Sequence, residues 1–144
     1  MDIVMKSIEY GTEEYETSID IRNEAFRKPW GLDIRNEDLT GDKDMDMYGG
    51  YSNGKMIATI FLTEDDGKTA RVKSVAILEE YRVSGLGTYL MNFIEDIARE
   101  RGYTKAALMG RVMVEGFYHK LGYKTLSEPF DYNTIPHIEM KKEL

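Results

Sequence analysis

A glycine-bracketed turn between an apolar run and an amphipathic stretch is the feature that most restricts how this chain can fold. The turn is the sequence RVSGLG at residues 82–87, which follows the apolar run at residues 69–78 and opens a helical pattern at residues 85–101. With a further apolar run at residues 105–109, this order predicts a βαβ crossover whose two strands are parallel. Such a turn aims several backbone N–H groups at one point in front of a helix dipole, and that point suits a phosphate group.

The rest of the chain predicts strands and helices around this unit. Asn-Gly at residues 53–54 and Asp-Asp-Gly at residues 65–67 are hairpin turns, and Pro29 should end a first helix that starts near residues 11–14. The polar residues 31–45 predict a loop with at most a short helix at residues 36–39. Strands are expected at residues 4–8, 47–51, 55–63, 69–78, 105–109, 123–126 and 135–141, and a short helix at residues 114–121. The expected fold class is therefore α/β, with a mixed, mostly antiparallel sheet flanked by helices in a single domain over residues 1–144.

The helix expected at residues 85–101 has the clearest pattern in the chain. Leu86, Leu90 and Ile94 belong to one apolar stripe, and Glu95 and Arg99 are predicted to pair at i,i+4 spacing on the other face.

Composition excludes several classes of protein. Apolar residues make up 42% and charged residues 31% of the chain, which suits a globular protein. The absence of cysteine excludes disulfides, thiolate metal sites and a cysteine nucleophile, and it fits a reducing cytoplasm; we expect no metal site. No segment approaches the ~20 apolar residues of a membrane span. The net charge of −7 argues against nucleic acid and anionic membranes as partners, and it either attracts cationic amines or keeps the protein soluble.

The glycine turn does not match either common nucleotide motif. A dinucleotide fingerprint needs a third glycine, but Leu90 stands at that position. The Gly-Lys-Ser/Thr of a P-loop is also absent. The turn alone therefore indicates a phosphate site of some other kind.

The turn and a second motif together resemble the GCN5-related N-acetyltransferase (GNAT) superfamily over about residues 71–123. Residues 75–87 are similar to that family's central strand and pyrophosphate loop, and the sequence FYHKLGY at residues 117–123 is similar to its second signature. A bacterial branch of small stand-alone acetyltransferases has similar residues at Arg22, residues 26–29, Gly31 and residues 135–137.

This resemblance implies that acetyl-CoA is the acyl donor and lies in a V-shaped gap where two parallel strands splay apart. The strand at residues 75–77 would pair with the pantetheine arm, and the backbone amides of the loop at residues 83–88 would hold the pyrophosphate. Arg82 would contact a phosphate or form an ion pair with a neighbouring acid. Arg111 stands where the family often has asparagine, so it would contact CoA or an acidic substrate. The implied cofactor-binding residues are Val75, Ala76, Ile77, Arg82, Val83, Ser84, Gly85, Leu86, Gly87, Thr88 and Arg111.

The resemblance also implies direct attack by a primary amine, without a covalent enzyme intermediate. Tyr118 stands where the family places its general acid, and its ordinary pKa of about 10 would make proton transfer to the CoA thiolate nearly thermoneutral. Many members carry a glutamate base on the strand where this chain has alanines at residues 106–107. Glu79, Glu80, His137 or a chain of water molecules are the remaining candidates for the base.

The resemblance implies that the acceptor is a small-molecule amine or a protein amine, and it allows a homodimer, which is common among such domains. A non-catalytic acyl-CoA-binding module on the same fold is the alternative function, because the strand glutamate is missing. Substrate choice is expected from Trp30, Asp33, Glu37, Asp38, Asp42, Phe130, Asp131 and Tyr132.

Overall fold

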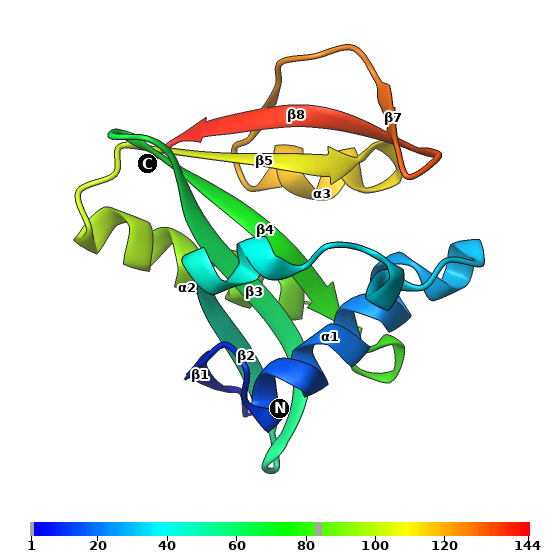
Figure 1. Ribbon diagram of the computed structural model, residues 1–144. Coiled ribbons are helices and arrows are strands. Elements are labelled where there is room, and N and C mark those ends of the chain that lie inside the picture. Colours follow the sequence, from blue (N-terminus) through cyan, green and yellow to red (C-terminus); the bar gives the residue numbers. More distant parts are fainter. Residues whose placement is uncertain (1, 83–84) are drawn as a thin grey trace.

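The computed structural model describes residues 2–82 and 85–144, which form an eight-stranded sheet with helices on both faces (Figure 1). The strands are β1 (Val4–Ile8), β2 (Asp46–Ser52), β3 (Lys55–Asp66), β4 (Thr69–Ile77), β5 (Lys105–Arg111), β6 (Lys124–Thr125), β7 (Phe130–Tyr132) and β8 (Ile135–Glu143). Their order is β1-β2-β3-β4-β5-β8-β6, and β7 pairs with β8. The β4–β5 pair is parallel and the other pairs are antiparallel, as the expected crossover requires.

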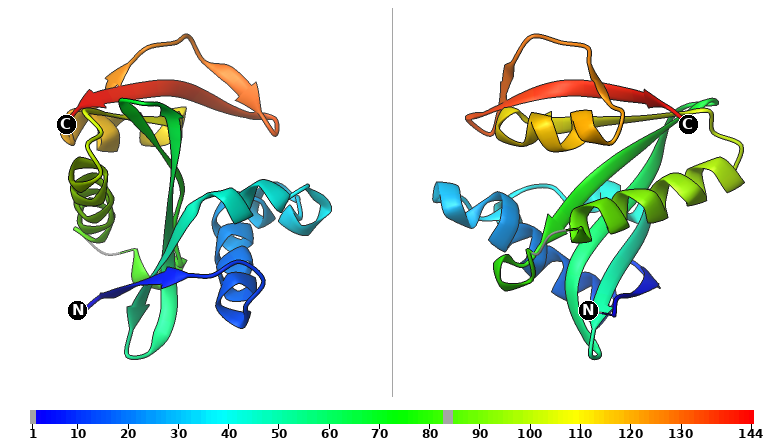
Figure 2. Two further views of the ribbon diagram at one scale, coloured as in Figure 1. Left: turned by 60° about the vertical axis from the view of Figure 1, so that its left-hand side comes forward. Right: turned by 180° about the vertical axis from the view of Figure 1, so that it is seen from behind.

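Helices cover the two faces of this sheet unequally. The α-helices are α1 (Glu13–Phe26), α2 (Leu86–Glu100) and α3 (Glu115–Lys120). The short 3₁₀ turns are η1 (Lys28–Trp30), η2 (Ile34–Asn36), η3 (Thr40–Asp44), η4 (Glu79–Tyr81) and η5 (Val112–Val114). Figure 2 shows α1 on one side of the sheet and α2 with α3 on the other. No helix in the described parts of the chain is both long and apolar enough to span a membrane.

The parallel strands separate soon after they start. β4 and β5 pair at three positions, from Thr69 opposite Lys105 to Arg71 opposite Ala107. Beyond Arg71, β4 continues to Ile77 while still paired with β3, and β5 continues to Arg111 while paired with β8. The sheet therefore opens between β4 and β5, which confirms the expected splay.

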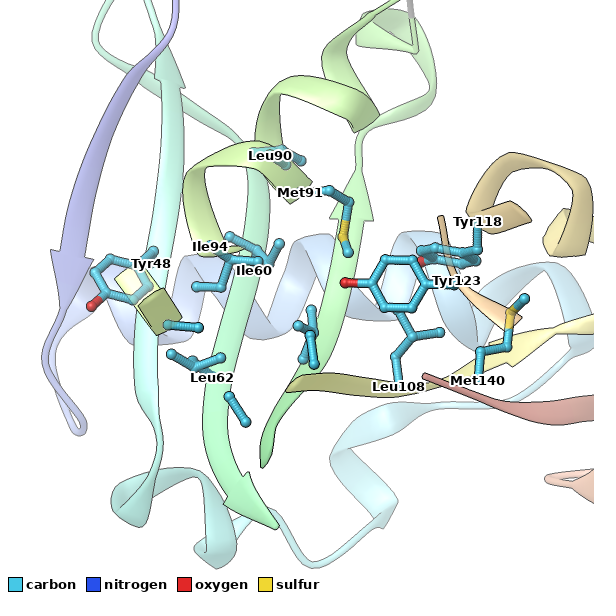
Figure 3. Packing of buried hydrophobic residues seen from close by; sticks show 14 of the residues in the cluster. Tyr48, Ile60, Leu62, Leu90, Met91, Ile94, Leu108, Tyr118, Tyr123 and Met140 are labelled. Carbon is cyan, nitrogen blue, oxygen red and sulfur yellow. The ribbon is translucent and has the colours of Figure 1, made fainter. Parts of the chain in front are cut away.

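Two apolar clusters hold the helices against the sheet. Tyr15, Ile19 and Ala25 of α1 pack in a cluster with Phe61 and Ala76. On the other face, Figure 3 shows α2 side chains over β3, and two tyrosines beside residues of β5 and β8. The labelled members of this second cluster are Tyr48, Ile60, Leu62, Leu90, Met91, Ile94, Leu108, Tyr118, Tyr123 and Met140.

Two local expectations differ from the structure. Residues 31–45 contain two 3₁₀ turns, η2 and η3, and neither coincides with the helix expected at residues 36–39. Glu95 is buried, although it was expected on the face of α2 away from the apolar stripe. Its carboxylate accepts hydrogen bonds from the Tyr123 hydroxyl and from Lys142 Nζ, each at 2.8 Å. These tertiary partners, from the segment between α3 and β6 and from β8, explain the burial. Arg99 still lies 3.8 Å from this carboxylate.

Candidate active site

A cavity of about 410 Å³ lies where β4 and β5 separate. β4 contributes residues 71–75, β5 contributes residues 108–111, and α3 contributes Tyr118. The remaining lining residues are Arg22, Phe26, Arg27, Ile34, Glu37, Asp38, Leu39, Gly41, Asp42, Met45, Val114, Tyr132, Ile135 and His137. The cavity is therefore bounded by the open strand edges and by residues from both faces of the sheet.

β4 carries a bulge at the edge of this cavity. Thr59 stands opposite Ala76 and Phe61 opposite Lys73, so one residue of β3 faces two residues of β4 between these pairs. Ser74 in this bulge has φ of 55°, and its carbonyl accepts a hydrogen bond from Thr59 Oγ1 at 2.7 Å. A left-handed conformation at a residue other than glycine costs about 1–3 kcal/mol and is concentrated at functional sites. The sequence did not predict this bulge, because nothing in the residue types marks Ser74.

The predicted pantetheine strand lies beside the cavity. Val75 lines it, Ala76 is buried in the cluster under α1, and Ile77 ends β4. The Ile77 carbonyl accepts a hydrogen bond from Arg82 Nε at 3.0 Å. Arg82 was expected either to contact a phosphate or to form an ion pair with an acid. Among the described residues it forms no such ion pair, and its side chain instead ties the turn to the end of β4.

The glycine turn leads directly into α2. Gly85 has φ of 93° and precedes the first helical residue, while Val83 and Ser84 lie outside the described residues. The first backbone N–H groups of a helix have no partner within it, so those at Leu86, Gly87 and Thr88 are available to an anion. A Cβ on Gly87 would lie 2.9 Å from Phe117 Cζ. This glycine therefore also permits the close approach of α2 and α3.

Tyr118 combines a buried ring with an unpartnered hydroxyl. Its side chain is 8% exposed and packs edge-on against Phe117 and Tyr123, with centroid distances of 5.0 and 5.9 Å. Among the described residues its hydroxyl has no hydrogen-bond partner, whereas the Tyr123 hydroxyl is bonded to Glu95. A Cβ on Gly110 would lie 3.3 Å from two Tyr118 ring atoms, so that glycine makes room for the ring.

Burial raises the pKa of Tyr118 to about 12, and the nearby Arg111 charge opposes this rise. Proton transfer from Tyr118 to a thiolate is therefore less favourable than the ordinary tyrosine pKa of about 10 implies. Tyr118 can instead donate a hydrogen bond to a thiolate while remaining protonated.

His137 lies in the cavity with one ring nitrogen already engaged. Its Nδ1 is 2.7 Å from the Ile135 carbonyl oxygen. Because a carbonyl only accepts, Nδ1 carries the proton and Nε2 of the neutral ring has a free lone pair. Burial lowers the pKa of His137, and the Arg111 and Arg27 charges lower it further. A neutral imidazole of this kind can accept a proton.

The other candidate bases lie elsewhere. Glu79 and Glu80 are exposed and line a separate hollow of about 300 Å³ with Arg82 and Leu78. His137 is therefore the one of the three proposed side chains that lines the larger cavity among the described residues.

Two of the acidic residues expected to influence substrate choice already have protein partners. Glu37 accepts two hydrogen bonds from Arg27, at 2.6 and 3.0 Å. Asp42 accepts hydrogen bonds from Arg22 at 2.9 Å and from Tyr15 at 2.8 Å. The structure places Glu37, Asp38, Asp42 and Tyr132 at the cavity, and Trp30, Asp33, Phe130 and Asp131 outside its lining.

Comparison with known proteins now identifies the family. The sequence model of the Acetyltransferase (GNAT) family matches residues 12–123, so the chain belongs to that family. The protein YyaT of Bacillus subtilis is 41% identical over 78 residues, which are 54% of this chain and 53% of YyaT. The match thus spans about half of each protein.

Solved structures share the whole fold. ElaA of Escherichia coli has a TM-score of 0.82 at 18% identity, covering 99% of this chain and 100% of that one. A GNAT family acetyltransferase from Elizabethkingia anophelis with acetyl-CoA bound has a TM-score of 0.73 at 21% identity, covering 99% and 98%. The superfamily and the fold class expected from the sequence are confirmed.

Proposed function

We propose that this protein transfers an acetyl group from acetyl-CoA to a primary amine in a ternary complex. The observation that carries the proposal is the cavity at the β4–β5 opening, into which the buried Tyr118 brings an unpartnered hydroxyl. The bound acetyl-CoA of the Elizabethkingia anophelis structure supports the choice of donor.

In this proposal the donor spans the turn and the strand edge. The amides of Val83, Ser84, Gly85, Leu86, Gly87 and Thr88 bind the pyrophosphate. The free edge of β4 at residues 75–77 pairs with the pantetheine arm. One of its N–H groups polarises the thioester carbonyl, an effect worth about 2.7–4 kcal/mol per donor in acyl-transfer enzymes.

The reaction needs one proton acceptor and one hydrogen-bond donor. The amine nitrogen attacks the thioester carbonyl carbon, the C–N bond forms, and the C–S bond breaks to release the CoA thiolate. His137 Nε2 accepts the proton from the attacking nitrogen, directly or through one water molecule. Tyr118 donates a hydrogen bond to the departing sulfur and stays protonated, and the thiolate takes its proton from solvent after release.

A panel of amines tests this proposal. Purified protein, acetyl-CoA and each amine are incubated while free thiol is measured, and acetylated product is identified by mass spectrometry. We expect amine-dependent thiol release above hydrolysis without amine. Thermal unfolding with acetyl-CoA is measured in parallel, because a ligand at 100 times its Kd stabilises by about 2.7 kcal/mol. Stabilisation without turnover of any amine would favour the non-catalytic acyl-CoA-binding module, and absence of stabilisation would contradict both functions.

A further inference from the structure

The cavity is lined by four arginines, three of which pair with acidic side chains. These pairs join Arg22 to Asp42 at 2.9 Å, Arg27 to Glu37 at 2.6 Å, and Arg71 to Asp65 at 2.6 Å. Their charges are therefore compensated within the protein.

Arg111 is the exception. No acid lies within ion-pair distance of its guanidinium among the described residues. Burial lowers the pKa of Arg111, and the nearby Arg82 and Arg27 charges lower it further, while Tyr118 acts in the opposite direction. Its guanidinium is half-buried and lies over the Phe26 ring, 5.6 Å from the centroid. A partly desolvated cation without an acidic partner lacks a counter-charge, and an anionic ligand would supply it.

The position of Arg111 favours the acceptor over the cofactor as that anion. Phe26 belongs to α1, on the face of the sheet opposite α2 (Figure 2). The N-terminus of α2, the proposed pyrophosphate site, packs against Phe117 of α3 on the other face. The Arg111 guanidinium therefore points toward the α1 side of the cavity.

The strand register places Arg111 beside the proposed base. Arg111 of β5 stands directly opposite His137 of β8, and both side chains line the cavity. Side chains directly opposite on antiparallel strands have Cβ atoms about 4.5–5.5 Å apart. In an α-amino acid only two bonds separate the carboxylate carbon from the amine nitrogen. A carboxylate bound to Arg111 would therefore hold the α-amine next to His137.

The rest of this end of the cavity is mixed in character. The apolar side chains of Phe26, Leu39 and Met45 line it together with the Arg22–Asp42 and Arg27–Glu37 ion pairs. Because those acids are already paired, Arg111 is the cation at this end that a ligand carboxylate can neutralise.

We infer, on the basis of the proposed acetyl transfer, that the acceptor is an α-amino acid whose carboxylate binds Arg111. The reaction would convert the free amine into an N-acetylamino acid and leave the carboxylate unchanged. Arg111 then determines specificity, while His137 accepts the proton.

The test measures binding of the N-acetylated products, because the protonation state of a free amine would otherwise affect the measured affinity. N-acetyl-L-phenylalanine and N-acetyl-L-phenylalaninamide differ only in the carboxylate, and their binding to the CoA-loaded protein is measured by titration calorimetry. The leucine pair is measured in the same way. We expect the acids to bind about 10- to 100-fold more tightly than the amides, as for a hydrogen-bonded charge pair.

Substitutions locate the effect. Arg111→Gln should reduce the acid-to-amide ratio to within about threefold, and Arg111→Lys, a point charge without the planar fork, should retain part of it. Both variants should keep the CoA affinity of the native protein. Arg35→Gln removes an exposed arginine outside the cavity and should change neither quantity.

Equal binding of acid and amide by the native protein would overturn the inference, whatever the variants do. It would also be overturned if Arg111→Gln weakened CoA and both probes alike, because Arg111 would then serve the cofactor. Either result with acetyl-CoA bound and amines acetylated would leave the proposed function intact. Failure to bind acetyl-CoA or CoA at all would instead contradict the proposed function itself.

Discussion

The contact between Gly87 and Phe117 predicts a measurable coupling between α2 and α3. Adding a methyl group by Gly87→Ala would put Cβ 2.9 Å from Phe117 Cζ and 3.2 Å from Cε1, well inside the usual 3.5–4.0 Å between carbons. Such overpacking costs about 1–3 kcal/mol, while alanine in place of glycine within a helix returns about 0.5–1 kcal/mol. We therefore expect Gly87→Ala to lower the free energy of unfolding by about 1 kcal/mol.

A double-mutant cycle isolates that contact. Phe117→Leu removes the ring atoms that the new methyl group would meet, so Gly87→Ala in this background should stabilise by about 0.5–1 kcal/mol. The coupling energy measured by urea unfolding should then be about 2 kcal/mol. Additive effects within about 0.5 kcal/mol would refute the packing argument. If Gly87→Ala instead left stability unchanged and abolished acetyl-CoA binding, the glycine would serve the approach of a phosphate alone.

Two buried ionisable groups give further predictions. The chain has two histidines, so ¹H NMR can follow the ring of His137. Burial should hold the pKa of His137 below about 6.5, and Arg111→Gln should raise that pKa. An unchanged titration in the variant would contradict the placement of Arg111. Neutral His137 also contributes stability that is fully present above about pH 6.5 and is lost as the pH falls through its lower folded-state pKa. The free energy of unfolding and kcat/KM should therefore both decline as the pH falls below about 6.5. Glu95→Ala leaves Lys142 and the Tyr123 hydroxyl without their buried acceptor and should destabilise by about 3 kcal/mol in urea unfolding; a loss below about 0.5 kcal/mol would show that this network is not stabilising.

Local patterns in the sequence predict most of the fold. β1 coincides with the strand expected at residues 4–8, because alternation and the following turn are both local signals. The hairpin between β2 and β3 forms at Asn53-Gly54, where both residues have the positive φ that this turn requires. The burial of Glu95 could not be predicted in the same way, because its partners Tyr123 and Lys142 are brought to α2 only by tertiary packing.

The candidate site likewise contains parts that local sequence patterns predict and parts that depend on tertiary packing. The turn and Tyr118 are recognisable because each lies within a short motif. The bulge at Ser74 and the space beside Gly110 depend on contacts with β3 and α3, so no local pattern marks them. The base could not be chosen among Glu79, Glu80 and His137 until the pairing of β5 with β8 brought His137 to the cavity.

The most direct test of the central claim is the turnover number of Tyr118→Phe with acetyl-CoA and an amine that the native protein acetylates. This change removes the hydroxyl and keeps the buried ring, so stability and acetyl-CoA affinity should stay close to those of the native protein. We predict that kcat falls by about 100-fold, the lower end of the range for a positioned acid or base. An unchanged kcat, with acetyl-CoA still bound, would contradict the claim that the cavity between β4 and β5 is an acetyl-transfer site in which Tyr118 assists the departing thiolate.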